Sequence, residues 1–132
     1  MEIIQLNNIT KKYKNKVIFS DVNLAIPSGS FTVMMGESGS GKTTLLNIIG
    51  GLEPQTSGEV IIEQQNIKNF SARQRADFYR HKVGLIFQGS YLQPQLTLFE
   101  NISLPGIFAK IPKVNRDQRI KELARELGIL EV

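Results

Sequence analysis

Residues 36–43 read Gly-Glu-Ser-Gly-Ser-Gly-Lys-Thr, a glycine-rich stretch that ends in a lysine and a hydroxyl side chain. Gly36 permits a sharp exit from a preceding strand, and Gly39 and Gly41 permit backbone geometry that a side chain would obstruct. Successive N–H groups can then point into one concavity and bind the oxygen atoms of a phosphate. A helix that begins here adds the partial positive charge of its N-terminus. The spacing therefore predicts a P-loop that binds ATP or a close relative.

Two side chains of the loop have expected chemical roles of their own. Lys42, the predicted catalytic residue of the loop, should reach the β- and γ-phosphates, and the Thr43 hydroxyl should ligate Mg²⁺. The alternative is a glycine-rich turn with an incidental lysine. An apolar run leads into the loop and a helical pattern leaves it, however, as the motif requires. The predicted cofactor-binding residues of the loop are Gly36, Glu37, Ser38, Gly39, Ser40, Gly41, Lys42, Thr43 and Thr44.

The elements that must position this loop follow from apolar spacing and from turn and capping signals. Residues 2–13 alternate apolar and polar side chains and predict a strand, with a hairpin partner over residues 16–26 after a turn at Asn15. Two short apolar runs, residues 31–35 and 83–87, predict strands buried on both faces. A helix is expected from the P-loop to Gly50-Gly51, followed by a strand over 59–63. Two capping boxes predict further helices, one from Ser71 and Gln74 to about Lys82 and a short one from Thr97 and Glu100 to Pro105. A last helix is expected from Asn115 to Gly128.

Composition bounds the class of protein. The 132 residues suffice for one domain, and 41% hydrophobic and 21% charged residues are ordinary for a globular protein. The absence of cysteine excludes disulfides and thiolate metal sites from these residues. No apolar run approaches the roughly 18 residues that span a bilayer, and the N-terminus lacks a signal-peptide pattern. The net charge of +4 could favour nucleic acid or a membrane surface, but no RNA-binding motif accompanies it, so a solvated surface that attracts a nucleotide is preferred.

Several segments of the sequence resemble ATP-binding subunits of ABC transporters. The resemblance is carried by GESGSGKTTLLNIIGGL at residues 36–52, Ser-Gly-Glu at 57–59, Leu-Ile-Phe-Gln at 85–88 and Leu-Thr-Leu-Phe-Glu-Asn-Ile at 96–102. It covers essentially the whole chain, and the GGL ending and the LTLFENISLP segment are most similar to exporters of peptides, lipoproteins, bacteriocins and macrolides. The resemblance implies an α/β P-loop NTPase fold, an incomplete ABC-type ATP-binding domain with an antiparallel β subdomain and parts of the parallel core and helical subdomain.

The resemblance also implies roles for residues outside the loop. Tyr13 is similar in position to an aromatic residue that stacks on adenine, with Val17 packed nearby, although from the residues alone packing at a strand end is the simpler interpretation. Gln88 resembles the Q-loop glutamine, a catalytic and metal-site residue that touches Mg²⁺ or the attacking water and senses the membrane partner; the alternative is a polar loop residue. Residues 91–108 would contribute to the surface that receives the permease, although their apolar members could equally be core.

Several segments of the family have no counterpart in these residues. The Leu-Ser-Gly-Gly-Gln signature, an apolar strand ending in Asp-Glu and the switch histidine are not found, and His81 is expected to be an exposed helix-end residue. The chain therefore resembles the N-terminal part of a single ATP-binding domain. The β subdomain and P-loop core are expected over residues 1–88, and the Q-loop and start of the helical subdomain over residues 89–132. Nucleotide binding with little hydrolysis by this chain alone is expected, which leaves its status as an enzyme open.

The partners implied by the resemblance are ATP with Mg²⁺, a transmembrane permease subunit, and a second copy of the chain or another self-association, without nucleic acid. The implied location is the cytoplasm, peripheral on the inner face of the cell membrane. Two competing functions are a soluble ABC-type ATPase and a non-catalytic nucleotide-binding regulatory fragment. The large insertions and tandem cassettes usual in soluble members are not found in this sequence.

Overall fold

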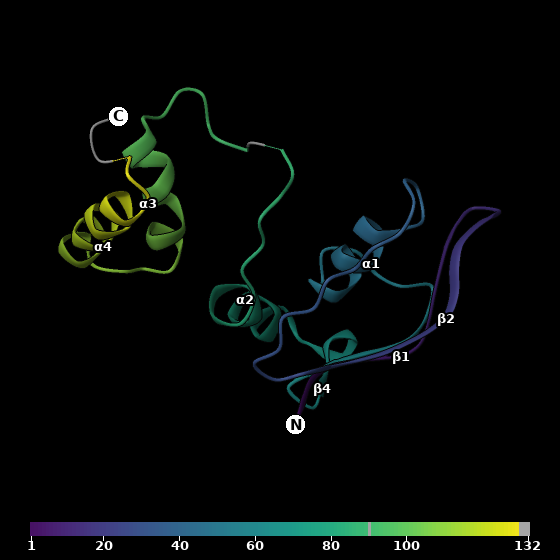
Figure 1. Ribbon diagram of the computed structural model, residues 1–132. Coiled ribbons are helices and arrows are strands. Elements are labelled where there is room, and N and C mark those ends of the chain that lie inside the picture. Colours follow the sequence, from purple (N-terminus) through teal and green to yellow (C-terminus); the bar gives the residue numbers. More distant parts are fainter. Residues whose placement is uncertain (90, 130–132) are drawn as a thin grey trace. The chain divides into compact units, whose positions relative to one another are not determined.

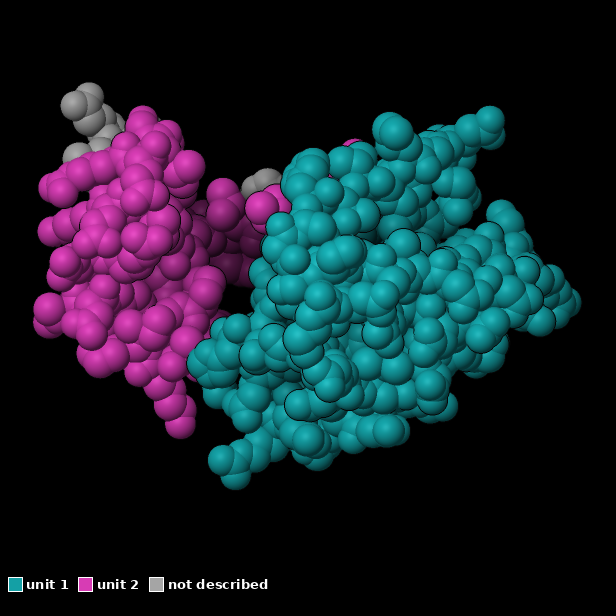
Figure 2. Space-filling model, turned by 60° about the horizontal axis from the view of Figure 1, so that its bottom comes forward, with its two compact units in different colours: residues 1–85 teal, residues 86–132 magenta. Residues whose placement is uncertain are grey.

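The computed structural model describes residues 1–89 and 91–129 (Figure 1). The chain divides into two compact units, residues 1–85 and residues 86–132, coloured teal and magenta in Figure 2. Within the described residues, every helix is too short or too polar to cross a membrane. The elements in chain order are β1 (Glu2–Tyr13), β2 (Lys16–Pro27), α1 (Lys42–Ile49), β3 (Ser57–Ile62), β4 (Gln65–Asn66), the 3-10 helix η1 (Ile67–Asn69), α2 (Ala72–His81), α3 (Leu98–Phe108) and α4 (Lys113–Glu126).

The first unit is built on a four-stranded antiparallel sheet with the strand order β2-β1-β3-β4. β1 and β2 form a hairpin, and Lys14 in its turn has a left-handed φ of 51°. Leu6 of β1 lies opposite both Leu24 of β2 and Val60 of β3, so apolar side chains from three strands share one face of the sheet. The hairpin predicted over residues 2–13 and 16–26 is confirmed.

An apolar core holds α1 and α2 against this sheet. Leu45 and Ile48, three residues apart on α1, are both buried, whereas Leu46 is 53% exposed. Phe78 of α2 enters the same core and makes an edge-on contact with the Phe70 ring. Because β1 and α1 share this core, the beginning of α1 has a defined place beside the sheet. The buried residues of the core are Leu6, Ile9, Leu45, Ile48, Val60, Ile67 and Phe78.

The two strands predicted over residues 31–35 and 83–87 are wrong. Both runs lack regular secondary structure, and their side chains are largely exposed, with Phe31 at 93% and Ile86 at 102%. An apolar run becomes a buried parallel strand only when neighbouring strands pair with it and helices cover both faces. No strand within residues 1–89 and 91–129 pairs with either run. The sheet described by the structure is therefore the antiparallel one.

Two elements after α1, α2 and β3, agree closely with the sequence pattern. The capping box of α2 is confirmed, because Ser71 Oγ accepts from the Gln74 N–H at 3.3 Å and the Gln74 side chain accepts from the Ser71 N–H at 2.9 Å. His81 is exposed at the end of α2, as expected. β3 begins at Ser57, two residues before the predicted start at Glu59.

The second unit is a hairpin of α3 and α4. The predicted capping box of α3 is confirmed: Thr97 Oγ1 accepts from the Glu100 N–H at 3.2 Å, and the Glu100 carboxylate accepts from the Thr97 N–H at 2.8 Å. The predicted stop at Pro105 is wrong, because α3 continues to Phe108. A proline inside a helix removes one backbone hydrogen bond, at a cost of about 3 kcal/mol, but here packing against α4 outweighs the local preference.

α4 begins earlier than the sequence pattern indicates. The Arg116 N–H bonds to the Pro112 carbonyl at 3.0 Å, so the helical hydrogen bonds already begin one turn before the predicted cap at Asn115. Arg116 also joins the two helices, because its Nε donates to Ser103 Oγ of α3 at 2.7 Å. The predicted end at Gly128 is confirmed by its left-handed φ of 67°.

Candidate functional site

The P-loop leads directly into α1 within the first unit. Gly41 is the N-cap of α1 and has a left-handed conformation, with φ of 90° and ψ of 8°. Because glycine has no side chain, it leaves the first N–H groups of α1 without a side-chain cap. The first helical bond joins the Leu45 N–H to the Gly41 carbonyl at 2.9 Å. The N–H groups of Lys42, Thr43 and Thr44 precede that bond, so the helix offers them no acceptor. These groups can bind a phosphate, and the helix dipole favours an anion at the same place.

Gly41 lies in direct contact with the β-hairpin. A Cβ atom at Gly41 would lie 2.8 Å from Ile18 Cγ2 and 2.9 Å from Phe19 Cδ1, closer than van der Waals contact allows. The left-handed φ is a second reason why this position requires glycine. β2 therefore packs directly against the end of the P-loop, and this contact positions the start of α1.

The Lys42 ammonium lies within the loop that precedes it. Its Nζ donates to the Gly36 carbonyl at 2.8 Å, to the Glu37 carbonyl at 2.7 Å and to Ser40 Oγ at 3.3 Å. These bonds wrap residues 36–40 around a single positive charge. The same short segment thus carries a lysine charge and the uncapped N–H groups of α1, two kinds of group that bind a polyphosphate.

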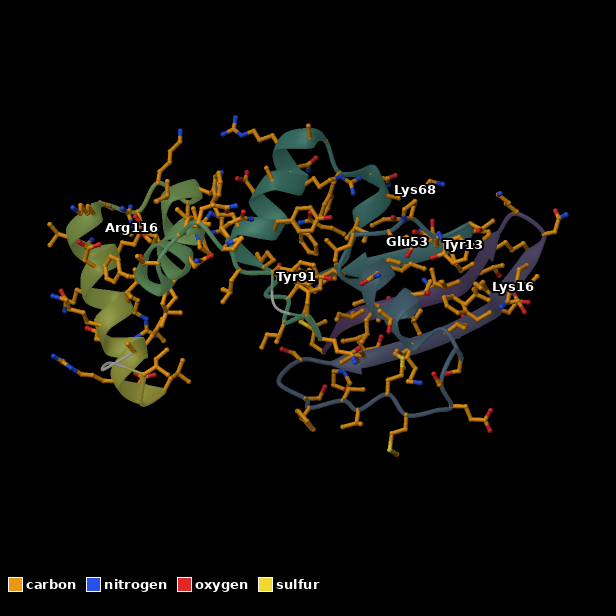
Figure 3. All side chains as sticks on the ribbon, turned by 90° about the horizontal axis from the view of Figure 1, so that it is seen from above. Tyr13, Lys16, Glu53, Lys68, Tyr91 and Arg116 are labelled. Carbon is orange, nitrogen blue, oxygen red and sulfur yellow. The ribbon has the colours of Figure 1, made fainter. Side chains whose placement is uncertain are left out.

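Tyr13, the last residue of β1, lies beside the first turn of α1. Its hydroxyl donates a hydrogen bond to the Glu53 carboxylate, and Figure 3 shows these two side chains close together. This bond is the main cause that raises the pKa of Tyr13 above its ordinary value of 10.0, while a hydrogen bond with the Thr44 side chain opposes the rise. Tyr13 is 44% exposed, so its ring is partly open to solvent.

Lys11 and Glu53 complete this cluster, although the sequence pattern did not single them out. Lys11 Nζ lies 2.7 Å from the Glu53 carboxylate, donates to the Pro54 carbonyl at 2.7 Å and lies 4.7 Å from the centre of the Tyr13 ring. The pKa of the Glu53 carboxyl lies below its ordinary value of 4.5. The hydrogen bond from Lys11 is the main cause, and the hydrogen bond from Tyr13 is the second. The alternation of β1 was an available signal for Lys11 alone, because residues two apart in a strand share one face, so Lys11 and Tyr13 do so.

Comparison with known proteins identifies the family of this chain. Residues 19–132 match the family model described as ABC transporter, and this match includes the whole P-loop. This chain belongs to the ABC transporter family. The similarity reaches beyond the loop, because the matched range also includes α2, α3 and α4.

Relatives in the ABC transporter family differ in the direction of transport given by their names. The bacitracin export ATP-binding protein BceA of Halalkalibacterium halodurans is 36% identical over 136 residues, which cover 100% of this chain and 54% of BceA. The spermidine/putrescine import ATP-binding protein PotA of Haemophilus ducreyi is 38% identical over 123 residues, which cover 93% of this chain and 32% of PotA. The chain thus spans about half the length of BceA and about a third of PotA.

A solved structure shares the fold. The ATP-binding cassette MJ0796, described as a dimer in a post-hydrolysis state bound to ADP and Pi, superposes with a TM-score of 0.82 and 38% sequence identity. The match covers 92% of this chain and 56% of that chain. The fold of an ABC-type ATP-binding domain is therefore confirmed for the part of the domain that this chain represents.

Among the remaining predicted site residues, Val17 lies near Tyr13 and Gln88 lies elsewhere in the chain. Val17, the second residue of β2, is the register partner of Lys12 and is 50% exposed, so it belongs to the hairpin end that carries Tyr13. Gln88 is exposed and belongs to the second unit, residues 86–132. The structure thus brings Tyr13, Val17 and the P-loop together in the first unit, and the role of Gln88 stays a prediction.

The surroundings of Thr43 fit a magnesium ion carried by a nucleotide. Within residues 1–89 and 91–129, no three His, Asp or Glu side chains are arranged to hold a metal ion by themselves. Mg²⁺ at nucleotide sites is usually held by phosphate oxygens, water and only one or two protein oxygens. The Thr43 hydroxyl, exposed in the first turn of α1, can supply one such oxygen.

Proposed function

We propose that this chain is the nucleotide-binding part of an ABC transporter and holds Mg-ATP at its P-loop. The observation that carries the proposal is the position of the Lys42 ammonium, 2.7 and 2.8 Å from two carbonyls of the loop and next to the uncapped start of α1. The lysine charge within the loop and the uncapped backbone N–H groups at the start of α1 together complement the triphosphate of ATP.

Each predicted residue has a part in this binding. The backbone from Gly36 to Thr44 would cradle the phosphates, and Lys42 would neutralise the charge of the β- and γ-phosphates. Thr43 would supply a ligand to Mg²⁺, with Gln88 as a second candidate ligand. The bound ion would supply electrostatic stabilisation of the phosphate oxygens. Tyr13 would stack on the adenine ring, and Val17 would pack beside it.

Binding can be tested directly by calorimetric titration of the chain with Mg-ATP. Lys42→Met should weaken binding about tenfold to hundredfold, because a charge-assisted hydrogen bond contributes about 1.5–3 kcal/mol. Lys68→Met is the matched control, because Lys68 is an exposed lysine of η1 in the same unit. Equal affinities for the wild type and the Lys42 variant would contradict the proposal.

Hydrolysis by these 132 residues alone should be close to background. Lys42 and the ion would supply electrostatic stabilisation, but no apolar strand ending in Asp-Glu is found in the sequence to position the attacking water. A phosphate-release assay at saturating Mg-ATP measures this. Turnover at more than about one per second, within the usual range of enzymes, would contradict the proposal.

We further propose that the nucleotide site serves a membrane permease on the inner face of the cell membrane and that the transporter is an exporter. The resemblance of residues 96–105 to export proteins supports this direction, as does the similarity to BceA, which is named for export. Because PotA is named for import, transport should be measured in membrane vesicles that contain the permease. ATP-driven movement of substrate away from the side that holds the chain is expected, and movement toward that side would contradict export.

A further inference from the structure

The ion pair of Lys11 and Glu53 lies beside Tyr13 but outside the residues assigned to nucleotide binding. The two side chains are only 8% and 22% exposed, and 2.7 Å separates their charged atoms. Lysine side chains are seldom buried to this extent unless a partner compensates the lost hydration. Here Glu53 and the Pro54 carbonyl are both within hydrogen-bond distance of the Lys11 ammonium.

The pair constrains the Tyr13 ring in two ways. The Glu53 carboxylate accepts the hydrogen bond of the Tyr13 hydroxyl, which fixes the far end of the ring. The Lys11 ammonium lies 4.7 Å from the ring centre, a cation–π contact that covers one face. With 44% of the side chain exposed, the ring can still offer its opposite face to a planar ligand. A ring already fixed in position loses less conformational entropy when a base stacks on it.

The same cluster joins β1 to the segment that follows α1. The Thr56 N–H donates to the Thr10 carbonyl at 2.9 Å, and the Lys12 N–H donates to Thr56 Oγ1 at 2.9 Å. Glu53 lies in this segment, three residues before Thr56. The end of β1 and the return from the P-loop helix are therefore fixed to each other by backbone and side-chain bonds.

We propose that Lys11 and Glu53 are positioning residues that hold the Tyr13 ring ready to stack on the base of a nucleotide whose phosphates lie in the P-loop. The proposal rests on the proposed nucleotide-binding function. It predicts that the pair contributes to recognition of the base and not to recognition of the phosphates.

The test compares two ligands, Mg-ATP and Mg-tripolyphosphate, which share phosphates and differ in the base. Calorimetry on the whole chain should show about tenfold weaker ATP binding for Tyr13→Ala, the usual contribution of one stacked base. Tyr13→Phe keeps the ring and removes its hydrogen bond to Glu53, and Glu53→Gln removes the charge that pairs with Lys11 and so loosens the ring's restraint. Each variant should weaken ATP binding about threefold. Tripolyphosphate affinity should stay within about twofold of the wild type in all three variants, since none removes a phosphate contact.

A double variant and a control separate positioning from general damage. In the Tyr13→Ala background, Glu53→Gln should cause no further loss of ATP affinity, because there is no ring left to position. Glu63→Gln is the control, since it breaks the exposed 2.8 Å ion pair with Lys82 in the same unit. It should leave the affinity for both ligands unchanged.

Each contrary outcome points to a different failure. If Tyr13→Ala weakens ATP binding but Glu53→Gln and Tyr13→Phe do not, the ring needs no positioning and only the present inference fails. If Glu53→Gln weakens ATP and tripolyphosphate equally, the pair has a purely structural role and the inference fails. If Tyr13→Ala leaves ATP affinity unchanged, base stacking at Tyr13 itself is wrong. If wild-type chain binds neither ligand, the proposed function is wrong.

Discussion

Replacement of Gly41 by alanine tests how closely the P-loop packs on the hairpin. The added Cβ would lie 2.8 Å from Ile18 Cγ2 and 2.9 Å from Phe19 Cδ1, and the backbone would keep a φ of 90° that L-residues rarely adopt. The backbone conformation costs about 1–3 kcal/mol, and the overpacking costs about 1–3 kcal/mol more. Gly41→Ala should therefore lower the free energy of unfolding by about 2–6 kcal/mol, a large part of the stability of a small domain.

Urea unfolding measures this loss of stability. Two other glycines separate the backbone cost from the overpacking cost in the same assay. Gly29 has a left-handed φ of 74° with nothing within 4 Å of an added Cβ, so Gly29→Ala should show the backbone cost alone. Gly84 also has nothing within 4 Å and no left-handed φ, so Gly84→Ala should change stability by less than about 0.5 kcal/mol. If Gly41→Ala is no more destabilising than Gly29→Ala, the contact between the P-loop and β2 is wrong.

Three further predictions concern the ion pair, the segment that precedes α3 and the exposed apolar runs. Because the pKa of Glu53 is lowered below 4.5, its carboxylate stabilises the fold fully above pH 4.5, and this contribution is lost as the pH falls through the folded-state pKa. The free energy of unfolding of Glu53→Gln should therefore fall less steeply than that of the wild type as the pH is lowered below 4.5. The Asn101 side chain accepts from the Gln93 N–H at 2.7 Å and donates to the Gln93 carbonyl at 3.1 Å, so thermal unfolding should show Asn101→Ala destabilised by about 1–3 kcal/mol; no change would mean that these bonds contribute nothing. With Phe31 and Ile86 almost fully exposed, light scattering should show concentration-dependent self-association that replacement of both by serine reduces, and a monomer at high concentration would count against it.

Elements that depend on near neighbours could be predicted from the sequence. The hairpin of β1 and β2 is specified by period-2 alternation on both sides of a short turn. The capping boxes at Ser71 and Thr97 join residues three apart, so their spacing alone indicates the beginning of each helix. The helix that follows the glycine-rich loop was predictable for the same reason, since the loop and α1 form one continuous segment of the chain.

Elements that depend on distant partners could not be predicted in the same way. The apolar runs 31–35 and 83–87 have the composition of buried strands, but composition does not supply the neighbouring strands that a ladder requires. At Pro105, tertiary packing outweighs a local helix-breaking preference. The ion pair of Lys11 and Glu53 joins residues far apart in the sequence, so only the folded chain reveals it.

The central claim is that backbone N–H groups of the P-loop bind the phosphates of a nucleotide. Nuclear magnetic resonance of ¹⁵N-labelled chain, titrated with Mg-ATP, observes these groups one by one. The largest shift changes are expected at the amides from Gly39 to Thr44, and tripolyphosphate should reproduce them. Shift changes that avoid these amides, or none at saturating nucleotide, would contradict the claim.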